Sequence, residues 1–396
     1  MQMNYNKLYH LMTKVMTLLY NFKTGRNIFR PVVVLLFVAS LFGLNSCGSG
    51  VDDDQDNDFD RAVLLNNWCD NLIIPSYENY YNETLILKDA VELFADDPTN
   101  IQNFESCRVA FISTYLSWQE VALYDFGPAS NRALLSTTNT YPTDIDKINQ
   151  AVPDDNWTPG SPATLDNIGL PAIDYLLNAD DAFNQLSNSP DRLAHLVRLI
   201  QFMKVEAEAV YSDWTTTYGA TFKASTGTEM GSSIGEVLNA FNKVYETYVR
   251  KQKLGLPTGI MTLSGTPLPG HVEAYYAQNL SVDLLASAIL PFENIYLGNY
   301  YDSSGILIEG MGIDDYLISF GDVEYGSILD SDIKAQIISS KQAISTLENP
   351  LSDYVVNNTA EANEVYQELQ ALVVLWKVDM MGALGVLVTY IDNDGD

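Results

Sequence analysis

Histidines are scarce in this sequence, and this limits the chemistry that it can perform. Of its three histidines, only His195 and His271 follow the basic N-terminal stretch. His195 lies in the apolar segment RLAHLVRLIQF, whose helical spacing favours a packed core residue over a ligand. His271 lies two residues before Glu273 in PLPGHVEAYY, so it is either a residue of a surface loop or part of a polar site.

The signatures of the common hydrolases and nucleotide-binding proteins are absent. The sequence contains no His-Glu-x-x-His zinc motif, no Gly-x-Ser-x-Gly nucleophile elbow, no phosphate-binding loop and no Cys–His nucleophile arrangement. Carboxylates remain as candidate groups, since the chain has 51 Asp and Glu against 21 Lys and Arg. Carboxylates gathered in one place would form an oxygen-rich site suited to Ca²⁺, Mg²⁺ or ferric iron.

The N-terminal residues read as a secretory signal. Residues 1–46 hold five Lys and Arg and no acidic residue, and they include the apolar run PVVVLLFVASLFGL. This run is shorter than the roughly 20 residues that a membrane-spanning helix needs. The following Leu-Asn-Ser-Cys resembles a bacterial lipobox, in which a peptidase cuts before the cysteine and its thiol carries the lipid. We predict a signal peptide over residues 1–46 and lipidation at Cys47; the alternative is an uncleaved anchor helix or a cysteine that carries no lipid.

An acidic tether is expected next, over residues 47–57, because GSGVDDDQDND after Cys47 cannot bury apolar surface. Without the first 46 residues the chain keeps 16 basic against 51 acidic residues, a net charge of −35. A field of this sign repels phosphate backbones and anionic lipid faces. We therefore expect no nucleic-acid partner, and a membrane contact through the lipid anchor.

Helical spacing recurs along the rest of the chain, while sustained apolar/polar alternation is absent. This pattern predicts an all-α protein of two packed helical bundles, over residues 58–222 and 230–396. The Gly/Ser/Thr-rich stretch between them marks the boundary, and residues 127–164 form a long connection within the first bundle. The first helix should bend or break at Pro75, and the next should start at Asp97-Pro98 and stop at Gly127-Pro128.

Two cysteines follow Cys47, at positions 69 and 107. In a helical hairpin that turns near Pro98 they lie about 28 residues before and about nine residues after the turn. At about 1.5 Å per residue this separates them by roughly 30 Å along the hairpin. We expect two free, buried thiols and no disulfide.

Four segments together resemble the imelysin-like family. They are YLSWQEVALYDFGP at 115–128, GLPAIDYLL at 169–177, LGLPTGIMTLSGTPLPGHVEAYYAQ at 254–278 and VDMMGALGVLVTYIDNDGD at 378–396. Each segment alone is weak, but their order and spacing match the family over nearly the whole chain after Cys47. The resemblance implies an all-helical, Bacteroidota-type lipoprotein of the cell envelope, on the outer membrane and either periplasmic or surface-exposed.

The family's second segment carries a His-x-x-Glu pair that has been read as a metal-ligand pair. In this sequence Pro171 replaces the histidine and Asp174 replaces the glutamate. Proline offers no lone pair to a metal and no proton to a substrate, which argues against an enzyme. Because proline is tolerated only in the first turn of a helix, Gly169 should begin the helix. Asp174 then either interacts with the helix dipole in the first turn or takes part in binding.

The resemblance also implies a shared cleft between the two bundles. Residues 118–127, 169–175 and 270–276 should converge there, with Asp174 partly exposed and close to Glu120 or Glu273. The candidate metal ligands are these three carboxylates, although Glu120 also fits the polar edge of its helix. The predicted binding residues are Trp118, Glu120, Gly169, Pro171, Asp174, His271 and Glu273.

The function implied by the resemblance is that of a non-proteolytic binding protein associated with iron uptake. Its ligand would be an iron or divalent metal ion, and its partners would be envelope proteins of iron uptake. One alternative is an imelysin-type metallopeptidase that acts despite the altered motif. Another is a glycan-binding outer-membrane lipoprotein, which the pairs Tyr275-Tyr276 and Tyr300-Tyr301 keep open.

Overall fold

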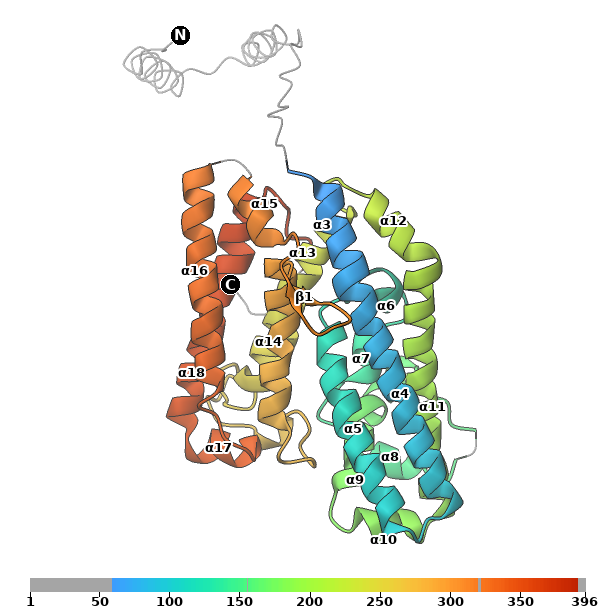
Figure 1. Cartoon of the computed structure of the whole chain (residues 1–396). Coiled ribbons are helices and arrows are strands. Elements are labelled where there is room, and N and C mark those ends of the chain that lie inside the picture. Colours follow the sequence, from blue (N-terminus) through green and yellow to red (C-terminus); the bar gives the residue numbers. More distant parts are fainter. Residues whose placement is uncertain (1–58, 155, 320–321, 391–396) are drawn as a thin grey trace, which may run out of the picture. The chain divides into compact units, whose positions relative to one another are not determined.

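Helices account for almost all regular structure in the computed structural model, which describes residues 59–154, 156–319 and 322–390 (Figure 1). The predicted signal peptide, the lipidation site at Cys47 and the acidic tether lie outside the described residues. The helices follow one another in two groups, which we call the first and the second helical group. The prediction of an all-α fold is confirmed.

The first helical group is built around three long helices, α4, α5 and α11, which lie side by side in Figure 1. Its elements are α3 (Arg61–Asn67), η2 (Trp68–Ile73), α4 (Ile74–Asp96), α5 (Ile101–Val121), α6 (Gly127–Asn131), α7 (Leu134–Thr138), α8 (Ile145–Ala151), η3 (Pro162–Asn167), α9 (Gly169–Asn178), α10 (Ala182–Ser187), α11 (Pro190–Asp213), η4 (Trp214–Tyr218) and α12 (Gly219–Ala224).

The second helical group places α14 against α5 of the first group and α16 beside α18. A two-residue antiparallel hairpin pairs Tyr300 with Ile308. The elements of the second helical group are α13 (Ser233–Val244), η5 (Tyr245–Gly255), η6 (Pro269–His271), α14 (Ser281–Leu297), β1 (Tyr300–Tyr301), β2 (Leu307–Ile308), α15 (Ile313–Ser319), α16 (Val323–Ile344), α17 (Leu351–Asn357), α18 (Thr359–Val373), η7 (Val374–Met380) and α19 (Met381–Ala383).

Side-chain hydrogen bonds fasten the start of the first group to the second. The Trp68 indole nitrogen donates to the Ile295 carbonyl oxygen at 3.2 Å. The Asn67 amide donates to the carbonyl oxygens of Gly298 and Met311 at 2.8 and 2.9 Å. Residues 225–232, which include the predicted boundary, are irregular between α12 and α13. Contacts do not divide the described residues into two domains, so the two-bundle division stays a prediction.

The prolines act differently from the prediction. The helix does not break at Pro75, because the π-helical segment η2 directly before it widens the turn that lacks the proline N–H. The next helix does not start at Asp97-Pro98. It begins at Ile101, since the Asn100 side chain caps it by accepting from the amides of Gln102 and Asn103 at 3.0 and 3.3 Å.

The predicted long connection contains more helix than expected. Helix α5 ends at Val121, and Gly127-Pro128 begins the short helix α6 instead of ending α5. The short helix α8 also lies in this connection, with the Asp144 carboxylate accepting from the Lys147 amide at 3.0 Å. The connection therefore packs against the long helices and supplies residues to the site described below.

Both cysteines of the described residues are free and buried, as predicted. The Cys107 thiol donates to the Ala90 carbonyl oxygen at 3.3 Å, across the hairpin formed by α4 and α5. Burial raises the pKa of each thiol to about 12. Cys69 and Cys107 are therefore inert core residues. Among the described helices, none combines the length and the apolar character needed to cross a bilayer.

Candidate functional site

The start of α9 is fixed by a glycine that no other residue can replace. Gly169 has a φ of +72°, and a β-carbon on it would lie 2.2 Å from the Thr138 carbonyl oxygen at the end of α7. Helix α9 begins at this residue, as predicted, and Pro171 occupies its first turn. Asp174 lies beyond the first turn, so the interpretation of Asp174 as a first-turn carboxylate is wrong.

Asp174 instead joins the first helical group to the second. Its two carboxylate oxygens accept from the backbone amides of Tyr276 and Ala277, each at 2.9 Å, and from the Asn178 side chain at 3.1 Å. Its exposed fraction is 1%, so the prediction of partial exposure is wrong. The physical reason is that the irregular segment after His271 folds over α9. Burial raises the pKa of Asp174 to about 7, against the effect of the three donors.

Glu273 is held in a different way, by a buried lysine. The Lys253 ammonium donates to one carboxylate oxygen of Glu273, and the side-chain amides of Asn139 and Gln119 donate to the other, at 2.7 and 3.3 Å. Glu273 and Lys253 have exposed fractions of 2% and 5%. Burial lowers the pKa of Lys253, and the charge of Glu273 opposes this effect. The backbone carbonyl of Glu273 accepts from the Ser281 hydroxyl at 2.6 Å.

A tyrosine completes this arrangement, which we call the polar network (Tyr115, Gln119, Asn139, Lys253 and Glu273). The Tyr115 hydroxyl donates to the Asn139 side-chain oxygen at 2.7 Å, and the Lys253 ammonium donates to the Gln119 side-chain oxygen at 2.8 Å. The Gln119 amide also reaches the Tyr115 carbonyl oxygen at 3.3 Å. Each side-chain polar group of the network thus has a partner, as buried polar groups require.

Glu120 and Trp118 are not part of the polar network. The Glu120 carboxylate accepts from the Asn79 amide of α4 at 3.2 Å, and burial raises its pKa. The Trp118 ring lies 5.4 Å from the Tyr80 ring and is buried. Because successive helix residues point about 100° apart, only Gln119 of this turn reaches Glu273.

The predicted metal site does not form in the part of the chain that the structure describes. Glu120, Asp174 and Glu273 are committed to separate partners, and no three His, Cys, Asp or Glu side chains of the described ranges are placed to hold a metal ion. The hypothesis that these three carboxylates share one ion is wrong for this arrangement. Pro171 offers no ligand either, so the residues present do not fit the metal implied by the family's motif.

The two histidines of the described residues differ in burial and in surroundings. His195 is fully buried in α11, its ring 4.7 Å from the Trp157 ring, and its Nδ1 lies 3.3 Å from the Arg198 guanidinium. Burial and the neighbouring arginines lower the pKa of His195 to about 4, so it is a neutral core residue, as predicted. His271 is half-buried in η6, at the start of the segment that reaches Glu273.

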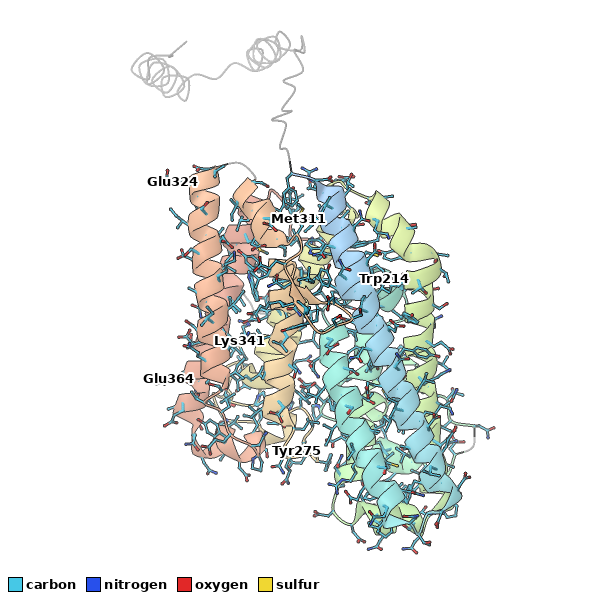
Figure 2. All side chains as sticks on the ribbon, viewed as in Figure 1. Trp214, Tyr275, Met311, Glu324, Lys341 and Glu364 are labelled. Carbon is cyan, nitrogen blue, oxygen red and sulfur yellow. The ribbon has the colours of Figure 1, made fainter. Side chains whose placement is uncertain are left out.

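A small pocket of about 40 Å³ marks where the segments meet. Its walls come from α9, from the loop between α7 and α8, and from the segment before α14. The lining residues are Tyr141, Pro142, Thr143, Pro171, Asp174, Gly270, Val272, Ala274, Tyr275 and Tyr276. Tyr275 lies between the two helical groups in Figure 2. Tyr141 also lines an inner cavity of about 10 Å³ beside Gln119, Asn139 and Lys253. The predicted segments come together, but in a packed interface instead of an open cleft.

Sequence reasoning missed Gln119, Asn139 and Lys253. Gln119 lies between Trp118 and Glu120, two of the predicted binding residues, and Lys253 directly precedes the family-like segment at 254–278. Neither has a motif of its own. An available signal was the excess of acid in the sequence, because a buried carboxylate needs a basic partner and the chain has few.

Comparison with known proteins agrees with the fold. The model of the imelysin family, peptidase family M75, matches residues 73–376, so the chain belongs to the imelysin family. The crystal structure of an iron-regulated protein A precursor from Parabacteroides distasonis is similar, with 17% identity, a TM-score of 0.67, and coverage of 85% of this chain and 97% of that chain.

A second solved structure, an imelysin-like protein from Psychrobacter arcticum, is also similar. It has 15% identity and a TM-score of 0.65, and the match covers 83% of this chain and 97% of that chain. At these identities the likeness shows the fold. Among curated proteins, no match was found.

Proposed function

We propose that this chain is a non-proteolytic binding protein of the cell envelope, lipid-anchored to the outer membrane and associated with iron uptake. The observation that supports a non-proteolytic function is that hydrogen bonds hold both oxygens of the Asp174 carboxylate. This carboxylate is buried and accepts two backbone amides of the segment that covers it. A carboxylate held in this way fixes structure, and its exposed fraction of 1% gives a substrate little access to it.

The neighbouring groups support the same proposal. A metallopeptidase needs an open coordination position for water and substrate. Here Pro171 supplies no ligand, and the Lys253 ammonium neutralises Glu273. The inner cavity beside Lys253 has a volume of about 10 Å³, which leaves room for one water molecule at most.

The association with iron rests on the family and on the P. distasonis structure, whose protein is described as iron-regulated. The signal peptide and the lipidated Cys47 would put this chain in the envelope, where proteins of iron uptake are its expected partners. An iron or divalent metal ion remains a candidate ligand elsewhere on the molecule or through a partner.

Incubation of the purified full chain with unfolded protein substrates and divalent metals tests the non-proteolytic part. We expect no chelator-sensitive cleavage, and we expect the same result for Asp174→Ala. Chelator-sensitive cleavage that disappears in Asp174→Ala would overturn the proposal in favour of an imelysin-type metallopeptidase. Growth of a deletion strain under iron limitation tests the second part. Slower growth and lower cell iron are expected, and unchanged growth and iron content would contradict it.

A glycan ligand is the second candidate, favoured by aromatic rings at the mouth of the pocket. Tyr275 is 42% exposed, and its ring lies 5.2 Å from the Tyr276 ring, which in turn lies 5.2 Å from the Tyr175 ring. Such rings stack on the apolar faces of sugars. Quenching of protein fluorescence by oligosaccharides that Tyr275→Ala abolishes would support this function, and the absence of quenching would remove it.

A further inference from the structure

We infer that the Lys253 ammonium is the internal cation of this site: it takes the position that a metal ion would need beside Glu273, and it thereby closes the site to metal ions. The inference deepens the proposed non-proteolytic function and rests on it. It concerns what occupies the site in this chain, and it predicts what the site would accept if the lysine were removed.

The ligands of the ammonium are the oxygen atoms that a hard cation would use. Lys253 donates to one carboxylate oxygen of Glu273 and to the side-chain oxygen of Gln119, at 2.8 Å for the latter. The second Glu273 oxygen accepts from Asn139 at 2.7 Å. The ammonium is a compact charge with three donors, and its partners Glu273 and Gln119 offer oxygen atoms of the kind that hard cations bind.

Burial explains why the carboxylate has this cation beside it. A carboxylate that is 2% exposed needs either a countercharge or hydrogen-bond donors on both oxygens, since an unpaired charge in the interior is very costly. The neighbouring carboxylate of Asp174 is satisfied by backbone amides, whereas Glu273 receives neutral donors on one oxygen only. Lys253 meets the requirement from within the chain, so no ion from solution is needed.

The backbone is unusual on both sides of the pair. Lys253 lies in the 11-residue π-helical segment η5, and such segments change which side chains face inward. Next to Glu273, Ala274 has a φ of +53°, a left-handed conformation that costs energy in a residue with a β-carbon. Each member of the pair thus lies in, or directly beside, backbone that departs from regular geometry.

Removal of the lysine side chain should leave a vacant cation position. In Lys253→Ala the lost atoms correspond to n-propylammonium, and the remaining oxygens of Glu273 and Gln119 face the space. We therefore expect Lys253→Ala to bind Mn²⁺. Binding is measured through the electron paramagnetic resonance signal of the free ion. We also expect n-propylammonium to raise its melting temperature. The affinity for Mn²⁺ should exceed that of Lys253→Ala/Glu273→Gln by at least about tenfold.

The matched control is Lys243→Ala. Lys243 likewise pairs with a carboxylate, that of Asp125 in the first helical group, at 2.9 Å, but its side chain is 43% exposed. Water already solvates this position, so neither Mn²⁺ nor n-propylammonium should gain affinity in Lys243→Ala. When Glu273→Gln is introduced alone, with Lys253 in place, Mn²⁺ binding should stay the same as in the unsubstituted chain.

Two results would overturn the inference. One is binding of Mn²⁺ to the unsubstituted chain that Glu273→Gln abolishes, because a metal would then share the site with Lys253. The other is a folded Lys253→Ala that gains neither Mn²⁺ nor n-propylammonium. If Lys253→Ala does not fold, Lys253→Met decides: adding Glu273→Gln should raise its melting temperature, and no rise contradicts the role of the charge.

Failure of this inference and failure of the proposed function give different results. Metal-dependent cleavage by the unsubstituted chain that persists in Glu273→Gln contradicts the proposed function alone. Binding of Mn²⁺ at Glu273 without any cleavage contradicts the inference alone.

Discussion

Asp174 and Glu273 both join the first helical group to the second, yet they are stabilised by different means. Asp174 receives neutral donors, two backbone amides and one side-chain amide. Glu273 receives an ammonium as well as two side-chain amides. The comparison shows that a buried carboxylate can be satisfied by the backbone or by a countercharge. Only the second solution places a second buried charge, the Lys253 ammonium, beside the carboxylate.

The largest expected effect follows from removal of the charged partner. Glu273→Ala leaves the Lys253 ammonium buried without a countercharge, and we expect a loss of about 3–5 kcal/mol in the free energy of unfolding. Urea denaturation of the full chain measures it. Glu120→Ala is the control, since its carboxylate is half-buried and accepts one hydrogen bond. Equal losses in the two variants would refute the countercharge role of Lys253.

A smaller loss is expected at Asp174, where no charge is left behind. Asp174→Ala leaves the amides of Tyr276 and Ala277 without acceptors, which should cost about 1–3 kcal/mol. The same denaturation experiment gives the value. The segment over α9 should also loosen, so hydrogen exchange of these two amides should accelerate. Unchanged exchange would show that the carboxylate does not hold the segment.

The dependence of stability on pH tests the burial of the Asp174 carboxylate. Burial raises the pKa of Asp174 to about 7 from 3.8, so the folded chain binds this proton more tightly than the unfolded chain. The stability gained from this proton is complete below the unfolded pKa and is lost as the pH rises through about 7. Relative to Asp174→Asn, the unsubstituted chain should lose up to about 1.4 kcal/mol per pH unit between about pH 5 and 7. Parallel curves for the two chains would contradict this assignment.

The fold was predictable because helical spacing is local. The spacing of apolar residues within each long helix predicts that helix. The free thiols of Cys69 and Cys107 were predicted from the length of the helical hairpin. The start of α9 at Gly169 was also readable, since proline is confined to the first turn.

The site was predictable in its segments and not in its contacts. The exposure of Asp174 depends on the path of the irregular segment after His271, which carries no periodic signal. The partnership of Lys253 with Glu273 depends on the π-helical turn η5, which no local propensity predicts. Gln119 and Glu120 differ by one position, but the turn of α5 sends only Gln119 into the polar network.

The central claim is that the Lys253–Glu273 pair closes this site to metal ions. Its most direct test is the metal content of the full chain purified from its native envelope, compared with that of Glu273→Gln prepared in the same way. Elemental analysis should give the same metal content for both chains. Close to one equivalent of metal in the unsubstituted chain, lost in Glu273→Gln, would contradict the account.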